Sequence, residues 1–230
     1  MALTKGFIPL VPLYVVGFLF KVHHDQSLSE MFTGYGPVIA LIIAIQLLST
    51  FLFFVKANFG NIKDIKTSLA NVLPSGLVAL STMSSVATLP VTLEAAEKNT
   101  KNKAIAEIVI PAATNIHHVG DSIAVPILIA AVFAINGFDP MNYPTFLIFA
   151  AYYMVAKFGV ASVPGGEIIV ILPILEAHFG FTDSMGGLLT TLYILSDPFI
   201  TVTNVLSNGA FAILMDKLCG RMKAFQGDKI

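Results

Sequence analysis

Long apolar runs, separated by short charged segments, divide the sequence into five parts. Residues 31–55 carry no charged side chain, and a run of that length is enough for a tilted helix across a bilayer. The later runs contain glycine, proline and hydroxyl residues near their centres. We therefore predict a spanning helix at 31–56, a helical hairpin at 65–95, a broken helix at 104–138, a second hairpin at 145–177 and a last helix at 188–218.

The two hairpins are predicted from helix breakers in the middle of apolar runs. In the first run, prolines and a glycine bracket the hydroxyl-rich residues 81–88, and in the second run Pro164, Gly165 and Gly166 follow Lys157. The turn of a re-entrant hairpin finds hydrogen-bond partners for its backbone N–H and C=O groups only where it is buried in protein or faces water. For residues 81–88 the alternative is one kinked spanning helix whose hydroxyls bond its own carbonyl groups.

The broken helix is predicted from a polar cluster inside the run at 104–138. His117, His118, Gly120 and Asp121 interrupt this otherwise apolar stretch. Ionisable groups in hydrocarbon cost several kcal/mol unless protein or water satisfies them. We interpret the cluster as an unwound helix centre that lines a binding site.

The last helix carries a polar stripe. Asp197, Thr201, Asn204 and Asn208 are spaced so that they fall on one helical face. Such a stripe must face protein or water. It has two interpretations: the four side chains line a binding site, or they form polar contacts that join neighbouring helices.

Composition assigns the chain to the all-α transmembrane class. Of its 230 residues, 56% are hydrophobic and 12% charged, and the mean hydropathy is +0.81, whereas about a quarter of the residues in soluble domains are charged. One cysteine excludes an internal disulfide framework, and a net charge of −1 gives no basic patch for nucleic acid. No nucleophile–base pair or metal-ligand spacing is visible, so we expect no enzyme, cofactor or nucleic-acid partner.

The cationic residues predict the orientation in the membrane. If both hairpins are re-entrant, the lysine-rich segments 56–66, 98–103 and 217–229 lie on one side, whereas the turns at 136–144 and 176–187 hold no Lys or Arg. By the positive-inside rule this side is the cytoplasm. We expect a multi-pass protein of the cell (inner or plasma) membrane with a cytoplasmic C-terminus.

Two hairpins of opposite entry, each followed by a polar helix, form a pair of inverted repeats, which in transporters places the substrate site near the bilayer midplane. Three motifs in this arrangement resemble the dicarboxylate/amino acid:cation symporters, the family of the glutamate-transporter homologues. The motifs are Ser84-Ser85-Val86-Ala87-Thr88-Leu89-Pro90-Val91-Thr92, Val163-Pro164-Gly165-Gly166, and Asp197 with Thr201, Asn204-Val205 and Asn208. The resemblance covers roughly residues 30–220 in the family's order.

The resemblance implies a set of site residues, with sodium or a proton as the coupling ion. For a small dicarboxylate or amino acid it implies Ser84, Ser85, Thr88, Val163, Gly165, Asp197, Thr201 and Asn204. For the cation we expect His117, Asp121, Asn204, Asn208 and Lys157.

The sequence departs from the family pattern at three site positions. Val119 stands where the family has an ion-binding carboxylate, Ile200 replaces an arginine that clamps acidic substrates, and Asn208 replaces an aspartate. Without the guanidinium, an acidic side chain loses its strongest specific contact. Acidic amino acids are therefore in doubt as substrates.

Ionisable side chains in these runs have two interpretations each. Lys157 either takes the place of a bound sodium or snorkels to the surface. Glu167 is expected to pair with Lys157 as a structural contact. The two histidines, His117 and His118, either take part in proton coupling or bond a neighbouring carbonyl.

The resemblance predicts a secondary active transporter that works by alternating access. Residues 31–230 then form a transport domain, and residues 1–30 are interpreted as the remnant helix and loop of the family's trimer-forming scaffold. Because most of this scaffold has no counterpart here, the alternative is a truncated or degenerate membrane subunit without transport activity of its own, and a homotrimer is doubtful.

Overall fold

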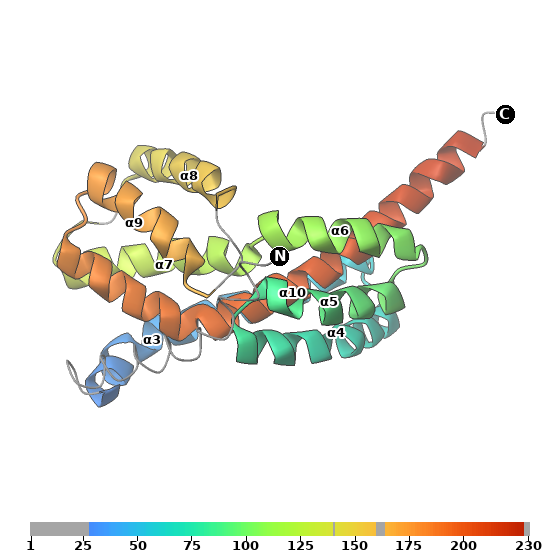
Figure 1. The fold of residues 1–230 in the computed structure, drawn as a ribbon, viewed down its shortest axis with the longest axis horizontal. Coiled ribbons are helices and arrows are strands. Elements are labelled where there is room, and N and C mark those ends of the chain that lie inside the picture. Colours follow the sequence, from blue (N-terminus) through green and yellow to red (C-terminus); the bar gives the residue numbers. More distant parts are fainter. Residues whose placement is uncertain (1–27, 140, 160–163, 228–230) are drawn as a thin grey trace. The chain divides into compact units, whose positions relative to one another are not determined.

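The computed structural model describes residues 28–139, 141–159 and 164–227, and the side chains of residues 34–220 within these ranges. This part of the chain is helical and contains no strand, so the predicted all-α class is confirmed (Figure 1). In chain order the helices are α3 (Leu28–Ala57), α4 (Ile62–Thr82), α5 (Ser85–Asn99), α6 (Lys103–Ile116), α7 (Val119–Ile135), α8 (Tyr143–Lys157), α9 (Gly166–Phe179) and α10 (Asp183–Gly227).

Three helical segments among the described residues are long and apolar enough to cross a membrane, namely Gly34–Ala57, Lys103–Ile135 and Asp183–Gly220. On α3, Leu47, Leu48 and Leu52 are exposed, while Gln46 and Phe54 are buried. An exposed leucine face on one side of a helix and a buried face on the other is typical of a membrane helix that borders lipid. The chain divides into two compact units, residues 1–41 and 42–230, and the contacts below lie within the second.

The first apolar pair, α4 and α5, forms a helical hairpin at the predicted place. α4 ends at Met83, which has φ +50°, and α5 begins after Ser84, whose hydroxyl accepts the N–H of Ala87. The two helices pack side by side (Figure 1), which distinguishes a hairpin from one kinked spanning helix. Hydroxyls within the pair do bond their own carbonyls, as Thr92 does to Thr88. The re-entrant course of the hairpin stays a prediction.

The predicted break in the third run is present. α6 ends at Ile116, His117 and His118 are not helical, and α7 begins at Val119. Both halves pack against α10, and Gly120 lies so close to α10 that an added Cβ would collide with the carbonyl oxygen of Ile200. Only glycine fits at this crossing, which fixes the start of α7 against the middle of α10.

The second pair consists of α8 and α9, which contact each other and are joined through residues 158–165. Gly165 caps the start of α9 with φ +69°, a conformation that glycine adopts without steric cost. Val163, at the predicted tip, lies outside the described residues. α10 then runs from Asp183 to Gly227 and extends beyond both ends of the predicted helix at 188–218.

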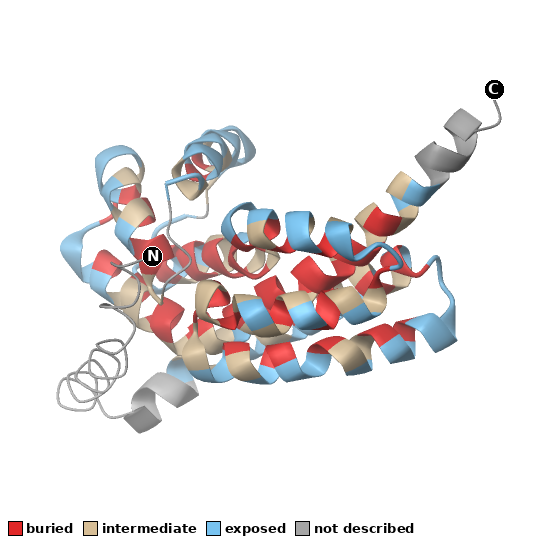
Figure 2. Cartoon of the chain, turned by 45° about the vertical axis from the view of Figure 1, so that its right-hand side comes forward, coloured by how far each residue is buried: buried red, intermediate tan, exposed pale blue. Residues whose placement is uncertain are grey.

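The apolar core joins α10 to the hairpin α4–α5 and to the end of α3. Its buried members are Phe54, Ala57, Ile65, Val72, Ala95, Ala210 and Ile213. Small residues let the helices approach, because a Cβ on Gly76 would already touch Leu206 and one on Gly209 would touch Val72. Figure 2 shows buried positions along these facing surfaces and exposed positions on the outer sides. This packing holds the polar middle of α10 against the break between α6 and α7.

Candidate functional site

Asp121, in the first turn of α7, is the centre of a buried polar network. One carboxylate oxygen accepts the Tyr193 hydroxyl at 2.6 Å, and the other accepts the Asn204 amide at 2.8 Å. Both donors lie on α10, and all three side chains are buried. The carboxylate therefore joins the broken helix to the last helix through charge-assisted hydrogen bonds.

Asn204 connects α10 to the backbone of the break. While its amide nitrogen donates to Asp121, its oxygen accepts the N–H of Gly120 at 2.7 Å. The carbonyl of Gly120 in turn accepts the side-chain amide of Gln46 on α3 at 3.1 Å. Gln46 is buried, and its own side-chain oxygen has no hydrogen-bond partner among the described residues. An acceptor without a partner at this depth is available to a ligand or a water molecule.

Lys157, in the last turn of α8, extends inward to the same carboxylate. Its Nζ lies 2.9 Å from Glu167 on α9, 3.1 Å from Nδ1 of His118 and 3.4 Å from Asp121. The Lys157 side chain is only 13% exposed, so it does not snorkel to the surface. Its contact with Glu167 is the pairing that the sequence predicted across the second hairpin.

The partners of His118 determine its tautomer. Nε2 lies 3.0 Å from the Thr114 carbonyl, which can only accept, so this nitrogen carries the hydrogen. Nδ1 is then the acceptor for the Lys157 ammonium, which is a donor only. In this assignment His118 joins the end of α6 to α8, and its Nδ1 also lies 3.6 Å from a carboxylate oxygen of Asp121.

Asp197 receives the tip of the second hairpin. One of its oxygens accepts the backbone N–H of Gly165 at 3.1 Å, and the other accepts the Thr201 hydroxyl at 3.1 Å. Asp197 and Thr201 are buried on the same face of α10, in agreement with the predicted stripe. Within the described ranges, this carboxylate accepts hydrogen bonds from two neutral donors and forms no ion pair.

His117 points away from His118 and toward α10. Its ring stacks on Phe211, with centroids 4.9 Å apart, and its Nδ1 lies 2.8 Å from the Asn208 amide group. The carbonyl oxygens of His117 and Asn204 also face this amide, at 3.1 and 3.3 Å, so its nitrogen is the atom that points toward them. The side-chain amide of Asn208 thus donates to both carbonyl oxygens.

Two hydroxyls at the first hairpin tip, those of Thr88 and Thr82, contact groups of their own turn. The Thr88 hydroxyl donates to the Ser84 carbonyl at 2.8 Å and lies 3.2 Å from the Thr82 hydroxyl, while Ser85 is buried at the start of α5. The hydrogen bonds described for Asp197 and Asn204 go to other parts of the chain, namely to Gly165, Thr201, Gly120 and Asp121. The substrate role of Ser84, Ser85 and Thr88 stays a prediction.

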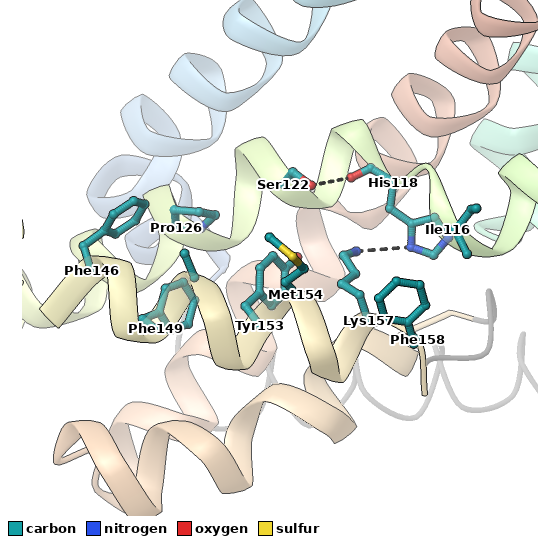
Figure 3. Close-up of a pocket in the computed structure, with 11 residues that line it drawn as sticks. Ile116, His118, Ser122, Pro126, Phe146, Phe149, Tyr153, Met154, Lys157 and Phe158 are labelled. Atoms are coloured by element: carbon teal, nitrogen blue, oxygen red, sulfur yellow. Dashed lines mark hydrogen bonds between the residues drawn. The ribbon is translucent and has the colours of Figure 1, made fainter. Parts of the chain in front are cut away.

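A cavity of about 330 Å³ lies between the broken helix and α8. Figure 3 shows Phe146, Phe149 and Met154 of α8, and Phe158 directly after it, on one side and residues of α6 and α7 on the other, with Lys157 turned toward His118. The walls are mainly apolar, and the polar groups are gathered at the end where Lys157, His118 and Ser122 lie. The cavity therefore opens onto the network around Asp121.

The structure thus brings together most of the predicted cation residues but in two groups, one around Asp121 with Lys157 and Asn204, the other around His117 with Asn208. Sequence reasoning missed Tyr193 and Gln46. Each is a lone polar residue in an apolar run, and nothing in the local pattern distinguishes it from a packing residue.

Comparison with known proteins identifies the lineage of this arrangement. The sequence signature of the sodium:dicarboxylate symporter family matches residues 1–218. The chain belongs to this family. It is also similar to the serine/threonine transporter SstT of Bifidobacterium adolescentis, with 26% identity over 211 residues. That match covers 89% of the present chain and 48% of the relative, so the chain spans about half the length of the curated protein it matches.

Family membership agrees with the helical architecture and with a location in the membrane. The resemblance inferred from the three sequence motifs is confirmed.

Proposed function

We propose that this chain provides the binding part of a secondary active transporter, which carries a small amino acid or organic anion together with a cation by alternating access. The observation that carries the proposal is the contact between the Gly165 N–H, at the tip of the second hairpin, and the buried Asp197 carboxylate on the last helix. A hairpin tip held directly on a site residue can close over a solute and open from it.

The charge at this position favours a substrate with an amino group. Asp197 is a buried carboxylate that accepts, among the described residues, one backbone N–H and one hydroxyl, which leaves acceptor capacity for an ammonium group. Ile200, at the position of the family's arginine, is fully buried and apolar. We therefore rank neutral amino acids above dicarboxylates, and the name of the serine/threonine relative supports the same order.

Coupling in this proposal requires that the cation bind the closed, loaded state more tightly than the open one. Asp121, with its ties to α10 through Asn204 and to α8 through Lys157, lies where such a preference would arise. The coupling ion, sodium or a proton, and the cytoplasmic C-terminus belong to the proposal. Membership in a family of symporters agrees with the expectation that the chain is not an enzyme.

Uptake into proteoliposomes tests the proposal. We expect labelled serine or threonine to accumulate under an inward sodium or proton gradient, and succinate or aspartate to accumulate less. Asp197→Asn, which keeps the size but removes the charge, should abolish uptake, whereas Asp64→Asn, on the exposed first turn of α4, should leave it unchanged. Uptake that is indifferent to both gradients would refute the coupling.

The second candidate is a truncated or degenerate subunit that does not transport. It is favoured by the Asn208 amide, which takes up carbonyl oxygens that would otherwise be available to a cation, and by the absence of a charged group at Ile200. Ligand-dependent thermal stability in detergent separates the two, because a ligand that binds only the native state raises the melting temperature. No shift with any amino acid or dicarboxylate, with or without sodium, would favour the subunit.

A further inference from the structure

Three acceptors from three parts of the chain surround one ammonium group. Around the Nζ of Lys157 lie Nδ1 of His118, a carboxylate oxygen of Asp121 and a carboxylate oxygen of Glu167, at 3.1, 3.4 and 2.9 Å. The first two belong to the break and to α7, the third to α9, and the lysine itself to α8. The ammonium thus lies between acceptor atoms from three separate elements, the break, α7 and α9.

These acceptors would form a pocket for a cation without the lysine. Their ligand atoms lie within 4.8 Å of one another, and the three residues are buried. Two of them are carboxylates, and placing two like charges together in a buried space is strongly unfavourable unless a positive charge lies between them. A cation between the carboxylates relieves this repulsion, and the flexible α8 side chain supplies it.

The cavity beside α8 gives this position a route from outside. It reaches both Lys157 and His118, and its rim contains Met154 and Phe158, which are 65% and 76% exposed (Figure 3). A volume of about 330 Å³ is far larger than an ammonium or methylammonium ion. A small cation could therefore reach the acceptors if the lysine side chain were shortened.

We propose that the space around Lys157 Nζ is a binding site for a small ammonium-type cation, which the chain fills with its own side chain. The contacts to Glu167 and His118, at 2.9 and 3.1 Å, have the length of hydrogen bonds from an N–H donor, and Asp121 lies at ion-pair distance, 3.4 Å, so the acceptors are arranged around an ammonium group. The resident ammonium positions α8 and α9 against the start of α7. This inference does not rest on the proposed transport function, because its test measures stability.

Chemical rescue of Lys157→Ala in the purified full chain tests the site. In detergent with tetramethylammonium chloride, which has no N–H donors, we expect this variant to melt several degrees below the unmodified protein. Replacing that salt with methylammonium chloride at equal ionic strength should restore at least half of the lost melting temperature. Sodium chloride forms a third arm, in which we expect a smaller recovery.

Two controls make the result specific. The unmodified protein should respond equally to the three salts, because its site is filled. Lys98→Ala removes a lysine that pairs with Glu94 at 2.8 Å but is 57% exposed, so it should show neither the loss nor the rescue. A methylammonium effect of the same size in either control would overturn the proposal, as would a recovery of Lys157→Ala in sodium chloride that equals or exceeds the recovery in methylammonium chloride.

If Lys157→Ala does not fold, the double variant Lys157→Ala/Glu167→Gln carries the test. It leaves the Asp121 carboxylate and the His118 nitrogen in place and removes one of the two opposing charges. Methylammonium should still raise its melting temperature relative to tetramethylammonium at equal ionic strength. A double variant that is indifferent to methylammonium would also overturn the proposal.

Discussion

At the scale of single residues, Gly120 shows how closely the broken helix approaches α10. A Cβ at this position would collide with the Ile200 carbonyl, which belongs to backbone and cannot rotate away. We expect Gly120→Ala to destabilise the protein by about 1–3 kcal/mol, the usual cost of overpacking a close contact. Thermal unfolding in detergent measures this loss.

The matched control for this substitution is Gly187→Ala, another helical glycine, on α10. A Cβ at Gly187 meets nothing within 4 Å, and the residue is helical. Alanine should therefore be neutral or slightly stabilising there. Equal effects of the two substitutions would contradict the close approach at Gly120.

Asn204 holds two buried groups at once, and its removal should be correspondingly costly. Asn204→Ala leaves the Gly120 N–H and one Asp121 oxygen without their partners. Each unsatisfied buried group costs about 1–3 kcal/mol. We expect a clearly lower melting temperature, whereas Asn115→Ala, which removes an exposed side chain bonded to Pro111, should change it little.

The sequence predicted Asn204 and Asp121 as site residues but did not pair them. Their polar character in apolar runs was visible locally, whereas the contact joins positions 83 residues apart. Tyr193 contacts the same carboxylate and was not predicted at all, because one tyrosine in a membrane helix resembles an interface anchor. The local sequence pattern shows which polar side chains need a hydrogen-bond partner, but the partner itself is determined by tertiary packing.

At the scale of elements, the turn of the first hairpin depends on a residue in an unfavourable conformation. Met83 has φ +50°, where a side chain costs roughly 1 kcal/mol relative to glycine. We expect Met83→Gly to raise the melting temperature slightly, since the turn keeps its geometry and loses the strain. A marked fall instead would mean that the Met83 side chain contributes packing that outweighs the relief.

Ser84, the next residue, should show the opposite sign. Its hydroxyl caps α5 by accepting the Ala87 N–H, and loss of such a cap costs about 1 kcal/mol. Ser84→Ala should therefore lower the melting temperature, while Ser81→Ala, an exposed serine bonded within α4, should have little effect.

Helix-breaking residues made the positions of the first hairpin and the broken helix predictable from the sequence. Pro74, Gly76 and Pro90 nevertheless lie inside helices, and the actual turn is at Met83 and Ser84 between them. The prolines indicated an irregular region but not its exact point, because neighbouring helices and hydroxyls satisfy the backbone groups that a proline leaves free. The break at His117 and His118 was located more closely, since ionisable residues mark it directly.

At the scale of the whole molecule, the single cysteine reports the orientation in the membrane. Cys219 lies toward the C-terminal end of α10, is partly exposed, and is the one cysteine in the sequence. A membrane-impermeant maleimide should label it in intact cells only after the membrane is made permeable, if the C-terminus is cytoplasmic. Labelling of intact cells would reverse the proposed orientation, and Cys219→Ser provides the unlabelled control.

The middle of α10 combines three functions within a few turns, and this has a consequence for its tolerance of length changes. Asp197 receives the hairpin tip, whereas Asn204 and Asn208, farther along, hold the two sides of the break. One extra residue between positions 198 and 203 would turn everything beyond it by about 100° and shift it by about 1.5 Å. Such an insertion would leave the tip contact in register while it moved both asparagines off their partners, so natural variation in this helix should proceed by substitution and not by changes in length.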